Sequence, residues 1–462
     1  MATITRYVDP NAAAGGDGTT NGLSGATCAY ASMAIWEAAQ QQNLTDGGGD
    51  IAECICDSNG GAADTTAVTI DGWTTSSTSY IWIHTPTSSR HDGTYLSTKY
   101  RLEVNDATVL AISDDYVRIE GLQIEQHGQT AVRSVVYISG QTASSNDVRI
   151  SSSIIKQGGG TSFRSIGVHI VSSNAVVSLW NSVIFNPANL GTSDTQNSAI
   201  RIASSSSVNI YSCTVFGGYR VLRADSGTVV VKNTYVGVIG GLTAYFGSAT
   251  LTTCASSDAT GSSGLQNIAI NTSNFTNVTA GSENYHLPSG SALIDVGTDT
   301  SGDSAPLNFT DDIDGQTRSG SWDIGADEYV AGGGIEGQAS LTQDAQSLSS
   351  TGTVSIAGSA SITQAAQIVS AAGTIPISGE AALTQAEQTV SATGVIAIQG
   401  LANITQAAQT IIATGFITRL VDAPHTSIHI RPSAFTIVGG FGSGSGPGMG
   451  QSGFLQGVGI YQ

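Results

Sequence analysis

One short apolar pattern returns five times between Val117 and Ala255, and it constrains the fold more than any other feature of the chain. Each copy begins apolar-x-apolar, bends through small or polar residues and is apolar again seven positions after its start, which predicts a strand, a bend and a second strand. The copies start at a nearly regular spacing, too short for a domain, at Val117, Val148, Val177, Val208 and Val229. A β-rich unit that repeats at such a spacing and cannot bury its apolar side alone is typical of a solenoid. We therefore expect a parallel β-helix in which each copy forms one coil.

Period-two alternation within these strands predicts which side chains face outward. If the starting valines point inward, one outward column holds Glu120, Ser151, Trp180, Tyr211 and Lys232, and the next holds Arg118, Arg149, Ser178, Asn209 and Val230. Neighbouring coils lie ~4.8 Å apart, so Trp180 is expected to stack on Tyr211 on an exposed face, flanked by Arg149 and Asn209. We interpret these four residues as candidate contacts for a glycan or a partner chain. The alternative is a stack that only shields strand edges.

The two ends of the segment 1–330 carry a family resemblance. The opening strings YVDPN, GGDGT and AYASMAIWEAA lie between Tyr7 and Ala39, and the closing string DDIDGQTRSGSWDIGADEY runs from Asp311 to Tyr329. They resemble the ends of right-handed parallel β-helix proteins of the pectin-lyase-like superfamily, as found in bacteria and in phage tail spikes and fibres. The resemblance implies a β-helix over residues 1–330 with a closing segment. Apolar residues at helical spacing between Ala29 and Gln42 predict a short helix that would cap the open end of the stack. Superfamily members include lyases, hydrolases, adhesins and structural shafts, so the activity stays open.

The acidic residues offer no clear catalytic arrangement. Hydrolysis of a glycosidic bond needs paired carboxylates about 5 to 9.5 Å apart, whereas the middle coils of the expected β-helix hold few acids. We therefore predict no catalytic residues. A richer acidic cluster, whose oxygens would suit Ca²⁺, consists of Asp311, Asp312, Asp314, Asp323, Asp327 and Glu328. Because this cluster lies in the closing string, a structural turn and strand cap is the favoured interpretation, and no cofactor is predicted.

From Ile335 the chain repeats with a strict period of 21, and four copies fill residues 335–418. Two all-β architectures fit this repeat as a shaft, a meander of long strands or a thin solenoid with one coil per copy. The expected inward residues are mostly Ala and Gly and bury little, so we expect a homo-oligomer; the resemblance to fibre proteins suggests a trimer. Residues 419–440 predict a terminal β segment, and residues 441–462 a glycine-rich docking tail.

Charge and targeting signals narrow the partners. The chain has 16 basic and 35 acidic residues, a net charge of −19, which argues against a nucleic-acid partner because phosphate contacts need clustered Lys and Arg. No long apolar run predicts membrane insertion, and residues 1–10 resemble no secretory signal. A β-helix of an extracellular type without an export signal is expected in a virus particle, released by cell lysis.

These observations favour a virion structural appendage, such as a tail spike, a fibre or a head-decorating protein. Its β-helix would bind a polysaccharide of the host surface, and its C-terminal region would attach to other virion proteins. One alternative is a depolymerase, a polysaccharide lyase or hydrolase that acts on the β-helix face. The other alternative is a purely structural filament subunit.

Overall fold

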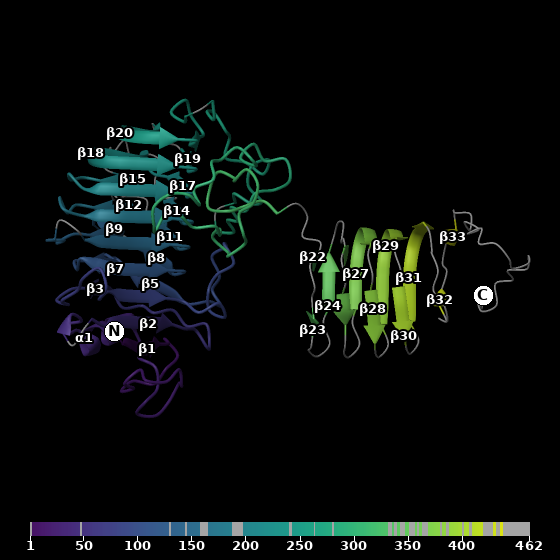
Figure 1. The fold of residues 1–462 in the computed structure, drawn as a ribbon, viewed down its shortest axis with the longest axis horizontal. Helices are drawn as coiled ribbons and strands as arrows, with labels where there is room; N and C mark the ends of the chain where they lie inside the picture. The colour runs from purple at the N-terminus through teal and green to yellow at the C-terminus, as the bar shows by residue number, and fades with distance from the viewer. Residues whose placement is uncertain are drawn as a thin grey trace, which may run out of the picture. The chain divides into compact units, whose positions relative to one another are not determined.

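The computed structural model divides the chain into two compact units, Met1–Tyr329 and Val330–Gln462 (Figure 1). The structure describes residues 2–46, 49–128, 131–143, 146–157, 165–186, 197–239, 243–262, 264–279 and 281–330, and beyond them only the strands β22 to β33. The glycine-rich tail over residues 441–462 lies outside the described residues, so its docking role stays a prediction.

Three stacks of parallel strands build the N-terminal unit, and we name them face 1, face 2 and face 3. Face 1 contains β1 (Thr3–Val8), β2 (Ile51–Cys56), β4 (Ile81–His84), β7 (Tyr116–Glu120), β10 (Asp147–Ser151), β13 (Val176–Trp180) and β16 (Ser207–Tyr211). Face 2 contains β5 (Arg101–Asn105), β8 (Gln123–His127), β11 (Ile154–Gln157), β14 (Val183–Asn186), β17 (Thr214–Gly217), β19 (Tyr235–Gly237) and β21 (Ala255–Ser256). Face 3 contains β3 (Val68–Ile70), β6 (Leu110–Ile112), β9 (Arg133–Ile138), β12 (Ser165–Ile170) and β15 (Ser198–Ile202).

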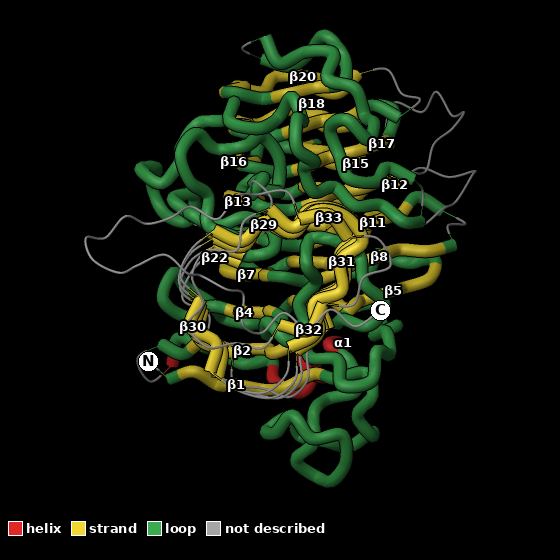
Figure 2. Tube along the Cα trace, turned by 90° about the vertical axis from the view of Figure 1, so that its right-hand side faces the viewer, coloured by secondary structure: helices red, strands yellow, loops and turns green. Residues whose placement is uncertain are grey.

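Two longer strands, β18 (Arg220–Lys232) and β20 (Thr243–Thr252), run through both face 1 and face 3 and join them into one sheet. Figure 2 shows the strands of successive coils one above another, with the loops extending from the sides of the stack. Every pairing between these strands is parallel, which confirms the predicted parallel β-helix.

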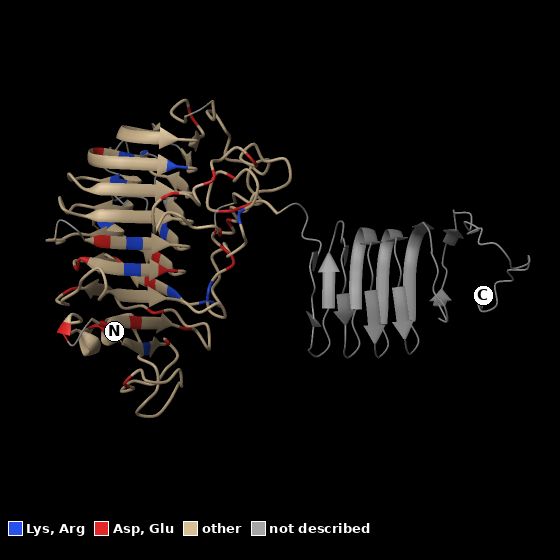
Figure 3. Cartoon of the chain, viewed as in Figure 1, with Lys and Arg blue, Asp and Glu red and all other residues tan. Residues whose placement is uncertain are grey.

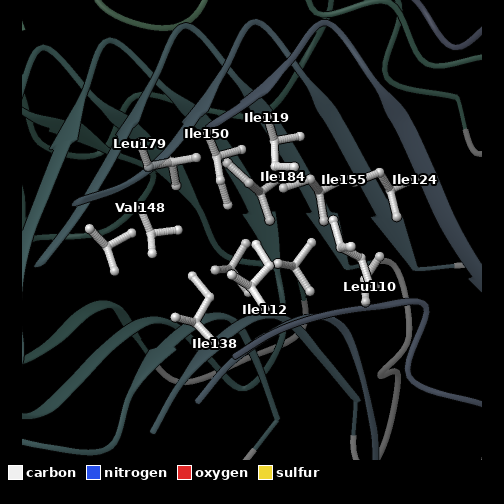
Figure 4. Close-up of a cluster of buried hydrophobic side chains, with 14 of the residues drawn as sticks. Leu110, Ile112, Ile119, Ile124, Ile138, Val148, Ile150, Ile155, Leu179 and Ile184 are labelled. Atoms are coloured by element: carbon white, nitrogen blue, oxygen red, sulfur yellow. The ribbon is translucent and has the colours of Figure 1, made fainter. Parts of the chain in front are cut away.

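The strand register confirms the predicted inward and outward columns. Val117 pairs with Val148, and the same column continues through Val177 and Val208 to Val229, each at most 2% exposed. In Figure 4 the labelled Ile, Leu and Val side chains of several coils converge in the interior of the stack. This continuous apolar column is the core of the N-terminal unit.

From β7 onward, each coil bends between face 1 and face 2 at one residue with a left-handed backbone conformation. The φ angles of these residues lie between 44° and 75°, and the residues are Gly121, Ser152, Asn181, Ser212, Asn233 and Thr253. Gly and Asn tolerate this conformation, whereas Ser and Thr are strained in it. The next residue of each coil points inward and is fully buried, and these residues are Leu122, Ser153, Ser182, Cys213, Thr234 and Cys254.

The helix α1 (Met33–Gln40) lies beside the first coils (Figure 1). The Ser32 hydroxyl accepts a hydrogen bond from the Ile35 amide at 3.2 Å, and the buried Asp64 carboxylate accepts one from the Met33 amide at 2.7 Å. Met33 and Trp36 are buried in the main core, so the helix covers apolar side chains at this end of the stack. Among the residues that the structure describes, no helix is long and apolar enough to cross a membrane.

The closing segment, which we define as residues 283–329, covers the outer side of face 2 and not the end of the stack. Its side chains form an apolar cluster with outward residues of face 2, made of Ile154, Val183, Phe185, Phe216, Tyr235, Ala255, Phe275, Tyr285, Leu287, Leu293, Ile313, Ile324 and Ala326. Two bend residues anchor it. The Asn181 amide group donates to the Asp311 carbonyl at 2.8 Å, and the Asn233 amide group donates to the Thr298 carbonyl at 2.6 Å.

The C-terminal unit pairs its strands in parallel, with a register that equals the sequence period. Ile335 pairs with Ile356 and Ile356 with Ile377, one full repeat further along the chain each time, which is the arrangement of a solenoid and not of a meander. One sheet contains β22 (Ile335–Glu336), β25 (Ile356–Ala357), β27 (Ile368–Ser378), β29 (Gln388–Gln399), β31 (Gln409–Thr418) and β32 (Ile428–Ile430), with β24 (Ser347–Ser350) and β33 (Phe435–Ile437). The other contains β23 (Ser340–Leu341), β26 (Ala360–Ile362), β28 (Ala381–Thr384) and β30 (Ala402–Thr405).

The bend column generates a stability prediction. Ser212 combines a φ of 46° with a buried hydroxyl that has no hydrogen-bond partner among the described residues. Ser212→Gly removes both costs, so we expect the free energy of unfolding to rise by about 1 kcal/mol, measured by urea unfolding of the full chain. Gly121→Ser is the matched reverse change, because a side chain there would meet Arg90 and Thr85. A Ser212→Gly protein that is less stable than the wild type would contradict the backbone strain at Ser212.

Candidate functional site

The outer side of face 1 carries the predicted candidate residues on consecutive coils. One column contains Trp82, Arg118, Arg149, Ser178 and Asn209, and the other contains His84, Glu120, Ser151, Trp180 and Tyr211. Both columns therefore extend to earlier coils than the sequence pattern indicates, because β4 pairs in register with β7, and β2 and β1 continue that register. The short strand β4 lacks the full repeat pattern, so its two aromatic side chains were not predicted to belong to the site.

Two adjoining cavities lie along these columns, and together we name them the face-1 groove. The first has a volume of about 220 Å³ and is lined by Tyr80, Trp82, Arg118, Ile119, Glu120, Arg149, Ser151, Trp180 and Pro306. The second, of about 640 Å³, is lined by Asn146, Asp147, Arg149, Val176, Ser178, Asn209, Tyr211 and residues 302–307. All four candidate contacts line the groove, and Arg149 lines both cavities.

The predicted stack of Trp180 on Tyr211 is wrong. Trp180 stacks instead on Phe309 of the closing segment, with ring centroids 6.2 Å apart. Tyr211 is only 6% exposed and lies beneath Lys232, whose Nζ is 5.0 Å from the ring centroid and 2.6 Å from Asp303 Oδ2. The exposed aromatic platform is lost because the closing segment covers these coils. The strand pattern alone could not show which distant segment returns to face 1.

The carboxylates that line the groove are all paired with cations. Arg149 Nη2 lies 2.5 Å from Asp147 Oδ2, and Arg90 Nη2 lies 2.6 Å from Glu120 Oε1. With Asp303 bound to Lys232, none of the three carboxylates in the groove is left as a free acid or base. Paired carboxylates of this kind fix the guanidinium groups in place and do not form the acid–base pair that glycoside hydrolysis needs.

Arg118 is the most perturbed cation of the groove. Its guanidinium carbon lies 3.3 Å from the centroid of the Tyr80 ring. Burial, and next the charge of Arg149, lower the pKa of Arg118. Arg118 and Arg149 are direct neighbours on β7 and β10, so the groove holds two guanidinium groups side by side against aromatic walls. This combination suits a ligand that offers both oxygen atoms and apolar ring faces.

The acidic cluster of the closing string forms turns and caps. Asp312 Oδ1 accepts from the Gln316 amide at 2.7 Å, and Asp323 Oδ1 accepts from the Asp295 amide at 2.7 Å. Arg318 is 4% exposed and donates to the Asp311 carbonyl at 2.9 Å and to Glu328 Oε2 at 3.2 Å. These contacts agree with the interpretation as a structural turn, and binding of Ca²⁺ remains the alternative to it.

Sequence reasoning missed one histidine that belongs to this cluster. His286 Nε2 lies 3.5 Å from Asp314 Oδ2 and 3.8 Å from Asp327 Oδ1, so the three side chains offer ligand atoms that a metal ion could share. Although burial alone would lower the pKa of His286, the hydrogen bond to Asp314 and the charge of Asp327 raise it to about 9. His286 is therefore protonated at neutral pH and pairs with the carboxylates as a cation. No pattern of the sequence placed it beside residues so far along the chain.

The protonated His286 predicts how stability depends on pH. Its pKa in the folded chain is about 9, above the ordinary value of 6.5, so its stabilising effect is fully present below pH 6.5 and is lost as the pH rises through 9. We expect the free energy of unfolding to fall by on the order of 2 kcal/mol over this range. Urea unfolding of the full chain at several pH values measures this fall in stability. His286→Gln should weaken the dependence of the unfolding free energy on pH. An unchanged dependence in this variant would contradict the ion pairs of His286.

Comparison with known proteins finds one similar solved structure and no family. No family model matches the chain, and no curated protein matches it. Among solved structures, the chain is similar to the crystal structure of the pectate lyase Pel9A, with 14% sequence identity, a TM-score of 0.31, and coverage of 71% of this chain and 96% of that chain. An identity and a TM-score this low transfer neither an activity nor a substrate to this chain.

Proposed function

We propose that the N-terminal β-helix binds a polysaccharide in the face-1 groove, and that the chain is a virion appendage that displays this groove to a host surface. The observation that carries the proposal is the convergence of Arg149, Trp180, Asn209 and Tyr211 on two adjoining cavities. These residues come from three different coils, and each was a candidate contact on the sequence pattern alone.

The chemistry of the groove supports a sugar ligand. Sugar rings present apolar C–H faces and many hydroxyl groups, and sites for such ligands combine aromatic walls with a few fixed polar groups. Tyr80, Trp82 and Trp180 supply the walls, and Arg149 and Asn209 supply donors. Because Arg149 is already held by Asp147, little side-chain entropy is lost when a ligand binds.

Glycan binding by the full chain tests the proposal. A screen of bacterial surface polysaccharides would identify a ligand, and titration calorimetry would measure its affinity for variants. Arg149→Ala removes a charged donor from both cavities, so we expect the affinity to fall about 10- to 100-fold. Arg133→Ala on β9 is the matched control, because this arginine lies on face 3 and outside the groove. If no polysaccharide binds, or if both variants bind like the wild type, the proposal fails.

A polysaccharide lyase is the second candidate, and Arg118 is the observation that favours it. A lowered pKa increases the fraction of Arg118 that is neutral, and only the neutral form can take a proton from a bound sugar. The ion-paired carboxylates disfavour a hydrolase by comparison. Incubation of the bound polysaccharide with the full chain separates the candidates, since a lyase releases unsaturated ends that grow with time. Loss of this release in Arg118→Ala, with binding retained, would assign the chain to the lyases.

The virion role is the second part of the proposal. It follows from the resemblance of the two ends of residues 1–330 to phage β-helix proteins and from the slender repeats that follow. A solenoid with such short coils has little room for a core, so packing against sister chains, as in a trimer, would stabilise the C-terminal unit. Attachment of this unit to other virion proteins would leave the groove free for the host polysaccharide.

A further inference from the structure

The two ends of the β-helix differ in how their backbone edges are protected. At the N-terminal end, the chain folds back on β1, where the Tyr7 amide donates to the Gly18 carbonyl at 2.9 Å and the Asp9 amide donates to the Tyr30 carbonyl at 2.8 Å. At the other end, β20 pairs with β18 on one side, and no described strand pairs with its other side. An unpaired edge strand offers free N–H and C=O groups to another strand.

The core is also open at this end. Ala249 and Leu251 of β20 occupy the inward column, yet they are only partly buried, whereas their neighbours Val229 and Val231 on β18 are at most 2% exposed. Only the start of β20 is protected, because Asp258 Oδ2 accepts from the Ala244 amide at 2.8 Å and the Thr260 hydroxyl accepts from the Tyr245 amide at 3.2 Å. From residue 247 onward, the strand lacks the cover that a further coil would give.

The sequence of β20 lacks the residues that usually prevent edge pairing. Its ten residues, TAYFGSATLT, contain no charged residue and no proline, and Figure 3 shows the strand free of charge. Edge strands are commonly protected by lysine, proline or inward charges. The basic residues at this end, Arg220, Arg223 and Lys232, are matched by three acidic residues, Asp225, Asp258 and Asp303, in a chain of net charge −19. Two copies can therefore meet here without the repulsion that their overall charge would cause.

We propose that two copies of this chain join end to end through β20, which pairs with its own symmetry mate as an antiparallel strand across a two-fold axis. This pairing continues the sheet from one molecule into the other and covers Ala249 and Leu251 of both. A two-fold contact uses the same surface twice. Because a two-fold contact occupies both of the edges that form it, association through β20 stops at two β-helices.

The mass of the full chain in solution tests this contact. Thr250 is exposed on β20, and Thr250→Lys brings two like charges together across the axis, which destabilises strand pairing. We expect the mass measured by sedimentation at micromolar concentration to be halved relative to the wild type, whatever number of chains the C-terminal repeats assemble. Ser24→Lys, an exposed change in the N-terminal loop, is the matched control and should keep the wild-type mass. A Thr250→Lys chain with the wild-type mass would overturn the proposal.

Cross-linking gives a second test that does not depend on blocking the edge. All five native cysteines are buried and free, so an introduced surface cysteine is the only accessible thiol in the described part of the chain. Ser248→Cys and Thr250→Cys, made separately, place a thiol near the two-fold axis, and mild oxidation should link at least one of them into a covalent dimer. Ser24→Cys should stay unlinked. Equal linking of Ser24→Cys, or none at β20, would overturn the proposal and leave the edge to a strand of another protein.

Discussion

The hydrogen-bonded register between successive coils is the constraint on which the N-terminal unit depends. A parallel register of five valines holds only if their coils turn from face 1 to face 2 at the same position, and each coil from β7 onward does so at one left-handed residue. The identity of that residue is then free to serve a second purpose. Where it is asparagine, at Asn181 and Asn233, the side chain reaches outward and binds the backbone of the closing segment. The bend that aligns the core therefore also fixes where the closing segment lies.

The position of the closing segment determines the surface that the outer side of face 1 presents to a ligand. Arg318 is buried beneath this segment and donates to Asn181 as well as to Glu328, so the acidic closing string is held against the stack by a network of charged hydrogen bonds. The same segment carries Asp303, Pro306 and Phe309 onto face 1. A flat row of exposed side chains becomes a groove with a wall. The closing segment therefore has two roles, because it covers the β-helix and also forms one wall of the face-1 groove.

The sequence was enough to predict the coil register and the outward columns, because a period of two inside a repeat leaves few alternatives for Val117 or Trp180. Four of the residues that line the groove were among the outward residues that the pattern indicated. It could not predict that Trp180 meets Phe309, since that contact depends on a segment far along the chain whose strings indicate only closure. Trp82 was missed because β4 lacks the full pattern, and His286 because its partners Asp314 and Asp327 come together only when the closing segment folds. The solenoid of the C-terminal unit needed the structure, since an odd period fits parallel and meandering strands alike.

The last coils of the β-helix are about as long as the coils of the C-terminal unit. The last coils of the β-helix lead from Val208 to Val229 and from there to Ala249, and a C-terminal coil leads from Ile356 to Ile377 with the same spacing as the first of these. Earlier coils of the β-helix are longer, yet their strands keep the same register. Because each coil contacts only its neighbours, a gene can gain or lose a whole coil by duplication or deletion and change the length of the protein by ~4.8 Å without redesigning the rest. Such a chain can become longer or shorter by whole coils during evolution while the residues of the face-1 groove stay unchanged.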